Sequence, residues 1–212
     1  MVICVSDNKL NVPKATMQRY PVYLKALRKL QSMGVDRILS RELSLFVDIE
    51  STTIRRDFSF VGSLGKQGYG YDVENLIETF DELLGVNFDE KIVLVGAGNL
   101  GRAILNYNRW NHVVGEIVCA FDADSKKLGV VSEIPIYHMS ELEEKLPDGC
   151  RIAILTVSHN VQETVDRLVK LGISGFVDFS GEHIQIPRDV AIKSVDVVAA
   201  IQELIFQVNN FE

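Results

Sequence analysis

The chain has 212 residues, of which 47% are hydrophobic, and a formal net charge of −7 at pH 7. This length and composition allow one large domain or two small ones with a packed core. The apolar runs are too short to cross a membrane, no secretory signal opens the chain, and three scattered cysteines form no disulfide framework, so we expect a cytoplasmic protein.

The first predicted element is a helix over residues 14–33. Gly34 suits the position just after its end, and Pro21 indicates a kink or a second start inside it. The apolar residues at helical spacing are Met17, Tyr20, Leu24, Leu27 and Leu30.

Two shorter helices are predicted next, over residues 40–47 and from about 51 to 61. Three helices with short joints are typical of a helix-turn-helix core. The expected caps are Ser40 for the first and Ser51 or Thr52 for the second, and the expected inward-facing residues are Leu43 and Phe46.

Residues 62–71 are too rich in glycine for a helix and predict a small hairpin, or wing. Asp72 is expected to cap a helix that ends at Leu84, with Gly85 after it. Residues 1–71 carry a charge of +5, whereas residues 72–212 carry −12. A basic segment on an acidic chain indicates either a localised anion-binding module or only a solvated surface.

From Lys91 the pattern changes to short apolar runs that alternate with helical segments. This alternation predicts a parallel α/β sheet. The expected strands are 91–98, 116–122, 151–157 and 175–180, and the expected helices between them are 100–108, 140–146 and 161–171.

The sequence VGAGNLG fits the dinucleotide pattern G-x-G-x-x-G with Gly96, Gly98 and Gly101. It follows a predicted strand and opens a predicted helix, as phosphate binding at a helix start requires. Gly96 allows the tight turn, Gly98 allows a pyrophosphate to approach the backbone, and Gly101 allows the helix to pack close to the strand.

Asp122 ends the second predicted strand, 26 residues after Gly96. A carboxylate there accepts hydrogen bonds from ribose hydroxyls and repels a 2′-phosphate, which favours NAD⁺/NADH over the phosphorylated form. Lys126 and Lys127 lie close enough to weaken that preference. A Rossmann-type domain that binds another nucleotide, such as coenzyme A, is the alternative.

The last predicted helix, residues 194–208, is apolar nearly all round. Such a helix must be buried on more than one side. Packing on its own sheet and insertion into a partner subunit are equally compatible with the sequence.

A dehydrogenase needs an acid or base beside the nicotinamide, and His159 is the best candidate because it follows a predicted strand. No recognisable catalytic set surrounds it, and the histidines have no metal-ligand spacing, so we expect neither an enzyme nor a metal site. Two alternatives stay open: a small NAD-dependent oxidoreductase and a non-enzymatic nucleotide-binding module.

A basic helix-turn-helix with a wing, joined to a Rossmann domain and an apolar last helix, resembles the Rex family of redox-sensing bacterial transcriptional repressors. The segments that carry the resemblance are IRRDFSFVGSLGKQGYGY (54–71), VLVGAGNLGRAILNY (93–107), FDADSKKLG (121–129), ILTVSHNVQETVDRLVKLGISGFVDF (154–179) and SVDVVAAIQELIF (194–206).

The resemblance implies a homodimer that binds double-stranded, palindromic operator DNA. It also implies that NADH releases the protein from the DNA, whereas NAD⁺ permits binding. It implies three parts: a winged-helix domain (1–85), a Rossmann NAD(H) domain (86–193) and a last helix (194–212) exchanged between subunits. The implied DNA contacts are Thr53, Arg55, Arg56 and Ser59 on the recognition helix and Lys66, Gln67 and Gly68 on the wing.

The implied nucleotide contacts are Gly96, Ala97, Gly98, Asn99, Leu100, Gly101, Tyr107, Asp122, Thr156, Val157, Ser158 and Asp196. In the family, the tyrosine and the last-helix acid form a polar network with a basic residue of the first helix. Here that basic residue is Lys25 rather than arginine, Ser158 replaces a proline, and residues 178–181 read DFSG in place of an acid-free stretch.

Overall fold

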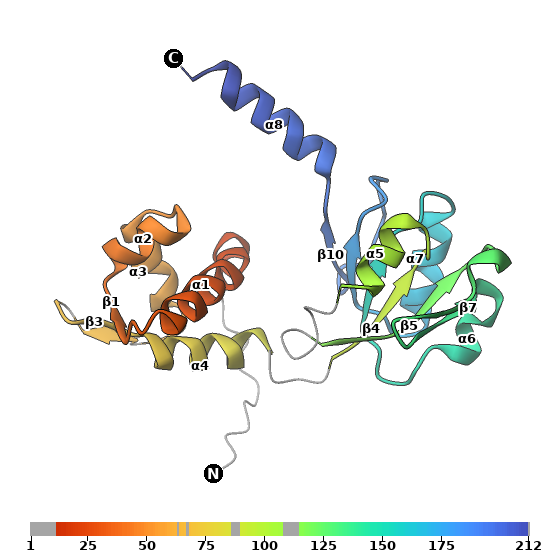
Figure 1. Ribbon diagram of the computed structural model, residues 1–212, viewed down its shortest axis with the longest axis horizontal. Coiled ribbons are helices and arrows are strands. Elements are labelled where there is room, and N and C mark those ends of the chain that lie inside the picture. The colour runs from red at the N-terminus through yellow and green to blue at the C-terminus, as the bar shows by residue number, and fades with distance from the viewer. Residues whose placement is uncertain (1–11, 63, 67, 86–89, 108–114, 212) are drawn as a thin grey trace, which may run out of the picture. The chain divides into compact units, whose positions relative to one another are not determined.

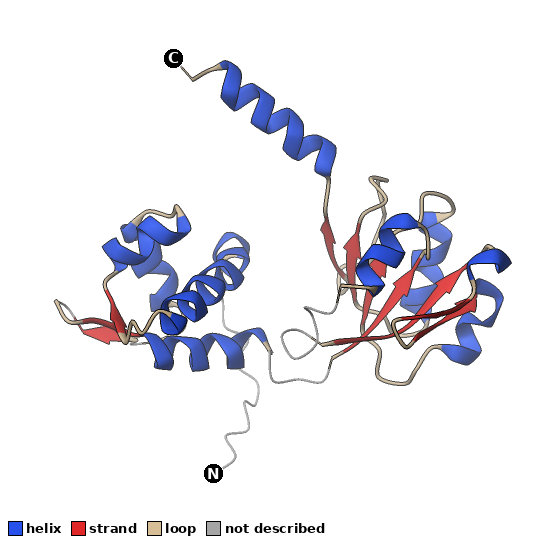
Figure 2. Cartoon of the chain, in the orientation of Figure 1, coloured by secondary structure: helices blue, strands red, loops and turns tan. Residues whose placement is uncertain are grey.

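The computed structural model describes the chain except for residues 1–11, 63, 67, 86–89, 108–114 and 212. The chain divides into two compact units, Met1–Asn87 and Phe88–Glu212. Helices dominate the first unit and a large sheet dominates the second (Figures 1 and 2).

The first unit is a winged helix-turn-helix. Its elements are α1 (Lys14–Ser32), β1 (Arg37–Ile38), α2 (Ser40–Val47), α3 (Ser51–Ser59), β2 (Gly65–Lys66), β3 (Gly70–Asp72) and α4 (Val73–Leu84). The predicted wing is confirmed, because β2 and β3 form an antiparallel hairpin. The strand β1, which sequence reasoning missed, pairs with the other edge of β3.

Two predicted helix ends are confirmed by their backbone geometry. Gly34, at φ +77°, follows α1, and its N–H donates to the Gln31 carbonyl at 2.9 Å. Asp72 caps α4 by accepting a hydrogen bond from the Asn75 N–H at 3.1 Å. Because Asp72 ends β3 and Val73 begins α4, no loop separates the wing from this helix.

Three predictions about the first unit are wrong: two helix caps and one inward-facing residue. Leu39 and Glu50, not serine or threonine, occupy the N-cap positions of α2 and α3, because Ser40 and Ser51 already belong to the helices, which start at least one residue earlier than those caps would require. Phe46 is 48% exposed rather than inward-facing. Of the two possibilities at Pro21, a second helix start is excluded, because α1 continues through this residue.

Aromatic rings form the centre of the first unit. Tyr23 and Phe58 pack edge to face with ring centroids 5.3 Å apart, and Phe58 meets Phe80 at 5.4 Å. These three rings come from α1, α3 and α4 and are at most 1% exposed. Aromatic pairs in this geometry stabilise beyond their buried area, so the recognition helix is anchored by its inner face.

The second unit is a doubly wound α/β domain. Its elements are β4 (Lys91–Val95), α5 (Asn99–Leu105), β5 (Glu116–Asp122), η2 (Ser125–Lys127), β6 (Gly129–Val131), β7 (Ile134–His138), η3 (Met139–Glu141), α6 (Leu142–Lys145), β8 (Ile152–Leu155), α7 (Val161–Lys170), β9 (Gly175–Asp178), β10 (Ala191–Ser194) and α8 (Val197–Asn209). The four predicted strands are present, and the sheet order is β10-β9-β8-β4-β5-β7-β6 with only β6 antiparallel.

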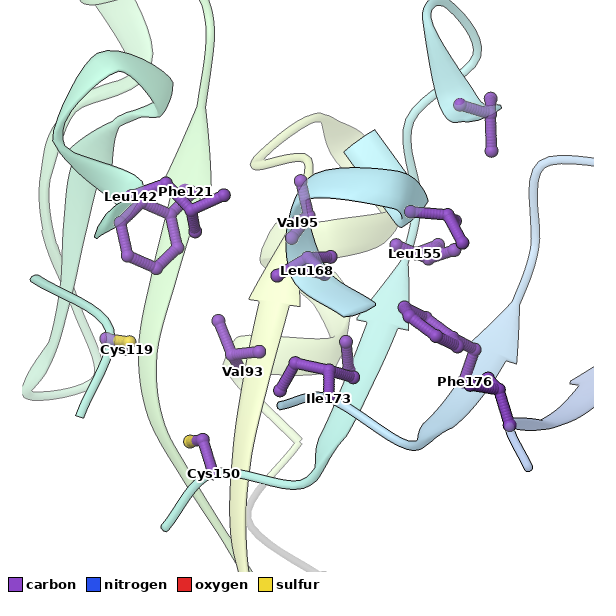
Figure 3. Close-up of a cluster of buried hydrophobic side chains, with 14 residues drawn as sticks. Val93, Val95, Cys119, Phe121, Leu142, Cys150, Leu155, Leu168, Ile173 and Phe176 are labelled. Atoms are coloured by element: carbon purple, nitrogen blue, oxygen red, sulfur yellow. The ribbon is translucent and has the colours of Figure 1, made fainter. Parts of the chain in front are cut away.

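Both faces of this sheet are covered, as a parallel sheet requires. On β4, Val93 and Val95 face one core together with α6 and α7, while Ile92 and Leu94 face the other together with α5. Figure 3 shows the first of these cores. The continuous apolar run of β4 is therefore explained by burial on both sides.

Cys119 and Cys150 are buried in the core shown in Figure 3. Burial raises the pKa of the Cys119 thiol to about 12. Since the thiolate is the reactive form, both residues act as small hydrophobic side chains.

Two residues separate the helix α8 from β10, and Ser194, the predicted start of the last helix, belongs to that strand instead. No residue of α8 is buried. Its large apolar residues are each more than half exposed: Val197, Val198, Ile201, Leu204, Ile205, Phe206 and Val208. The first alternative, packing of this helix on its own sheet, is therefore wrong.

Candidate nucleotide and nucleic-acid sites

The glycine loop between β4 and α5 is a tight turn that admits only glycine at two positions. Gly96 has φ +104°, and a Cβ there would lie 2.8 Å from the carbonyl carbon of Thr156. A Cβ on Gly101 would lie 1.9 Å from the Gly96 carbonyl oxygen. Thr156 fixes the turn because its hydroxyl donates to that same oxygen at 2.6 Å.

Gly98 differs from these two residues because a Cβ there would meet no atom within 4 Å. Internal packing does not require this glycine, so the open space where its Cβ would point is available to a ligand. A pyrophosphate that approaches the backbone needs such space.

A cavity of about 420 Å³ opens beside the glycine loop. Its lining comes from the carboxyl ends of β4, β5 and β8 and from the start of α7, which is where ligands bind in open α/β sheets. The lining residues are Val95, Gly96, Gly98, Asp122, Ala123, Asp124, Lys127, Met139, Thr156, Val157, Ser158, His159, Asn160, Glu163, Thr164 and Arg167.

Asp122 is only 6% exposed and is held at the end of β5 by backbone donors. One of its oxygens accepts from the Ala97 N–H at 2.7 Å and the other from the Asp124 N–H at 2.8 Å. Lys127 Nζ lies 3.4 Å from the carboxylate. The contacts from Lys127 to the two oxygens, at 3.4 and 3.5 Å, are long, so ribose hydroxyls could replace this lysine as donors to the carboxylate.

Six of the predicted nucleotide contacts line the cavity: Gly96, Gly98, Asp122, Thr156, Val157 and Ser158. Ala97, Asn99, Leu100 and Gly101 continue the loop into α5 without lining the cavity. Sequence reasoning missed Met139, Glu163 and Arg167, which come from later elements. Apart from the glycine loop, Asp122 and residues 156–159, only the lysine pair near Asp122 indicated in the sequence that further residues line the cavity.

Tyr107 and Asp196 do not line this cavity. Tyr107 lies two residues past the end of α5, rather than on that helix, and is 46% exposed. Asp196 caps α8, since its carboxylate accepts from the Ala199 N–H at 2.9 Å. The predicted acid therefore stands at the start of the last helix.

Asp178, the acid that departs from the family pattern, is 1% exposed at the end of β9. One carboxylate oxygen accepts from both the N–H and the hydroxyl of Ser180, at 2.9 and 2.6 Å. Among the described residues, the other oxygen has no hydrogen-bond partner. Ser180 thus satisfies one of the two oxygens of this buried carboxylate.

The candidate DNA-reading helix is α3, on which Arg55 and Arg56 are both exposed. Arg55 donates to the Ser40 hydroxyl of α2 at 3.1 Å, so its guanidinium is oriented by the first helix of the helix-turn-helix. Thr53 is half-buried, and the hydroxyl of the exposed Ser59 donates to the Arg56 carbonyl at 2.6 Å.

Asp57 follows this arginine pair and is 1% exposed. Its carboxylate accepts four hydrogen bonds from α1: two from Arg19 at 2.6 Å, one from Tyr23 at 2.6 Å and one from Thr16 at 2.9 Å. Burial raises the pKa of Asp57, but the bonds from Arg19, Tyr23 and Thr16 outweigh it, so the pKa lies below its usual value. Asp57 fixes the recognition helix to α1.

At the wing tip, Gly68 has φ +79° and would meet no atom within 4 Å with a Cβ. Gly68 and Arg55 line one groove of about 650 Å³, together with residues of α2 and β3. The wing and the recognition helix thus border the same surface. Gln67, a predicted wing contact, lies outside the described residues.

Two family models match the chain in agreement with these two units. Residues 11–59 match "Putative DNA-binding protein N-terminus", and residues 87–181 match "CoA binding domain". The described part of the chain contains no helix long and apolar enough to cross a membrane.

Curated relatives extend over nearly the whole chain. The redox-sensing transcriptional repressor Rex 2 of Enterococcus faecalis is 43% identical over 92% of this chain and 92% of its own. The redox-sensing transcriptional repressor Rex of Anoxybacillus flavithermus is 40% identical over 98% of this chain and 99% of its own.

Solved structures agree with these relatives. The Rex-family repressor RSP, crystallised with β-NAD⁺ and operator DNA, matches with a TM-score of 0.87 and 31% identity over 93% of each chain. RSP with β-NADH matches with a TM-score of 0.84 and 29% identity over 94% of this chain and 95% of its own. With the winged helix, the Rossmann cavity and relatives of this identity all in agreement, the chain belongs to the Rex family of redox-sensing transcriptional repressors.

Proposed function

We propose that this chain is a DNA-binding transcriptional repressor that senses the NADH/NAD⁺ ratio, binds palindromic operators and is released from them by NADH. The observation that carries the proposal is the presence, on one Rex-family chain, of two sites. One is a winged helix with exposed arginines, and the other is a glycine-loop cavity with an acid at the next strand end.

The cavity residues fit NAD(H). The open space before Gly98 suits the pyrophosphate, and Asp122 offers acceptors to ribose hydroxyls. Of the nucleotide contacts proposed above, Tyr107 and Asp196 are assigned to the nicotinamide end. NAD⁺ and NADH differ only there, so discrimination between them depends on that end.

Arg55 and Arg56 are proposed to read base edges and phosphates in the major groove, with Thr53 and Ser59 beside them. Lys66, Gln67 and Gly68 are proposed to contact the minor groove. Gly68 suits the tip of the wing because it has no Cβ to keep the backbone away from a groove floor.

The proposed active form is a cytoplasmic homodimer in which α8 inserts into the partner. The exposed apolar side chains of α8 support this arrangement, since a helix this apolar is not stable in water alone. The proposed divisions are the winged-helix domain over 1–85, the Rossmann domain over 86–193 and the exchanged helix over 194–212.

Coupling between the sites requires that NADH bind one dimer shape more tightly than another. Reduction of the nicotinamide removes one positive charge, and the proposed sensing residues are Tyr107, Asp196 and Lys25. A dimer reads a palindrome only while its recognition helices keep the spacing of the half-sites, so a change of shape releases the DNA.

The test is a gel-shift titration of a palindromic operator with no nucleotide, with NAD⁺ and with NADH. We expect tight binding with NAD⁺ and at least fivefold weaker binding with NADH, the lower range of allosteric coupling. Equal operator affinity in all three conditions would refute redox sensing. Loss of base contacts in Arg56→Ala should cost about 1–3 kcal/mol of operator affinity.

A further inference from the structure

We propose that Arg37 and Tyr69 form a further DNA contact beside the wing, in which Arg37 binds a backbone phosphate and Tyr69 holds its guanidinium in place. This inference rests on the proposed DNA-binding function and adds two residues to that site. It places a charged contact on β1, the strand that the sequence did not predict.

The first observation is a stacked pair on the wing sheet. The guanidinium carbon of Arg37 lies 4.1 Å from the centre of the Tyr69 ring. Arg37 belongs to β1 and Tyr69 to the turn between β2 and β3. The arginine therefore reaches from the third strand of the wing sheet to the tip of the hairpin.

The second observation is the exposure of the tyrosine. Tyr69 is 63% exposed, whereas Tyr20 and Tyr23 are at most 2% exposed in the core of the same unit. Core packing does not account for an aromatic ring in this position. The ring instead offers a flat face on which a planar guanidinium stacks.

Stacking leaves the N–H groups at the edge of the guanidinium available. Their fork matches two oxygens of a phosphate. Asp72 forms an ion pair with Arg37 at 3.5 Å, and both side chains are 43% exposed. This long, solvated ion pair is weak, so Arg37 can exchange it for a phosphate.

The third observation is continuity with the proposed reading surface. Gly68, the neighbour of Tyr69, borders the groove that Arg55 also borders. A duplex that contacts the recognition helix and the wing tip brings its phosphates to the end of this groove. Arg37 stacks on Tyr69, the residue next to Gly68, so its guanidinium lies close to this surface.

The test is the salt dependence of DNA binding by the full-length chain with Arg37→Gln. One lost phosphate contact per subunit lowers the slope of log K against log salt by about 0.9, or about 1.8 for a dimer. We expect affinity to fall by on the order of tenfold at moderate salt. Because a phosphate contact is independent of sequence, the operator and a scrambled duplex should weaken by the same factor.

The matched control is Arg28→Gln, which removes an arginine of the same unit that pairs with Asp81 at 2.7 Å. It should leave the slope unchanged. Tyr69→Ala should weaken binding less than Arg37→Gln, while Tyr69→Phe, which keeps the ring face, should behave as the unaltered protein. Thermal unfolding of each variant identifies any that fail to fold.

Three results decide the inference. Unchanged affinity and slope in Arg37→Gln would overturn it. Lower affinity with an unchanged slope would also overturn the phosphate contact, because it would show that the pair only stabilises the wing. Failure of the unaltered chain to prefer operator over scrambled DNA would instead contradict the proposed repressor function. The Arg37 contact would then still be measured on the scrambled duplex, and binding to neither duplex would refute both proposals.

Discussion

Asp57 is the residue on which the recognition helix depends. A buried carboxylate is tolerated only when it is paired and hydrogen-bonded, and here every donor to its carboxylate comes from α1, between 34 and 41 positions earlier in the chain. The sequence shows Asp57 only as the third residue of R-R-D. Its partners could not be predicted, because nothing local in the sequence relates them.

Asp57→Asn should lower the free energy of unfolding by about 3 kcal/mol, because removal of one partner leaves the other charge partly buried and unpaired. Urea denaturation at pH 7 measures it. The matched control is Asp81→Asn, which breaks the more exposed pair with Arg28 and should cost less than about 1 kcal/mol. Equal losses in the two variants would contradict the importance of the Asp57 cluster.

The lowered pKa of Asp57 also predicts that its contribution to stability depends on pH. A carboxyl group whose pKa is lowered by folding stabilises the folded state above its unfolded pKa of about 3.9, and this contribution disappears as the pH falls through the folded pKa. The pKa of Asp57 is lowered in this way. The difference in stability between the unaltered chain and Asp57→Asn should therefore be largest at neutral pH and shrink below about pH 4.

Gly101→Ala should abolish NADH binding and destabilise the second unit, because a Cβ there would lie 1.9 Å from the Gly96 carbonyl oxygen. Fluorescence titration with NADH measures the binding. Gly175→Ala is the matched control, since its Cβ would meet Ile152 at an ordinary 3.5 Å. Normal NADH affinity in Gly101→Ala would show that the loop geometry is not required.

At the scale of elements, four buried strands and the glycine-rich wing hairpin were predictable, whereas the remaining strands were not. The strands β4, β5, β8 and β9 appear as buried runs between helical segments. The strands β1 and β6 have only two and three residues, too few for any periodicity, and their pairing depends on distant neighbours. The last helix was predicted to start at Ser194, but α8 starts at Val197, because Asp196 is its N-cap.

Leu204→Glu on α8 should shift the protein from dimer to monomer, because it places a charge among the exposed apolar side chains proposed to enter the partner. Sedimentation velocity over a range of protein concentrations measures this change. Gln202→Glu introduces the same charge at a polar position of the same helix and should leave the dimer intact. A dimer unaffected by Leu204→Glu would place the interface elsewhere.

At the scale of the whole molecule, the two units should respond separately to their ligands. A ligand at 100 times its Kd stabilises the part that binds it by about 2.7 kcal/mol. In calorimetry, NADH should raise the unfolding temperature of the Phe88–Glu212 unit, and NADPH at the same concentration should raise it less, because Asp122 repels the 2′-phosphate. Equal shifts with both nucleotides would contradict the assigned role of Asp122.

The candidate nucleotide site was predictable where it is local in sequence. The glycine loop and Asp122 follow strands at fixed spacing, so pattern alone identified them. Met139, Glu163 and Arg167 reach the same cavity from elements that only the sheet order brings together. The DNA surface shows the same division, since the arginine pair was evident and the stacking of Arg37 on Tyr69 was not.

The direct junction of β3 with α4 has a consequence for the thermodynamics of recognition. A wing on a flexible tether loses conformational entropy when it settles into a groove, and that loss weakens binding. Here Asp72 ends the wing and caps the following helix, so the hairpin's base is ordered when the protein folds. The wing thus meets DNA already preorganised at its base.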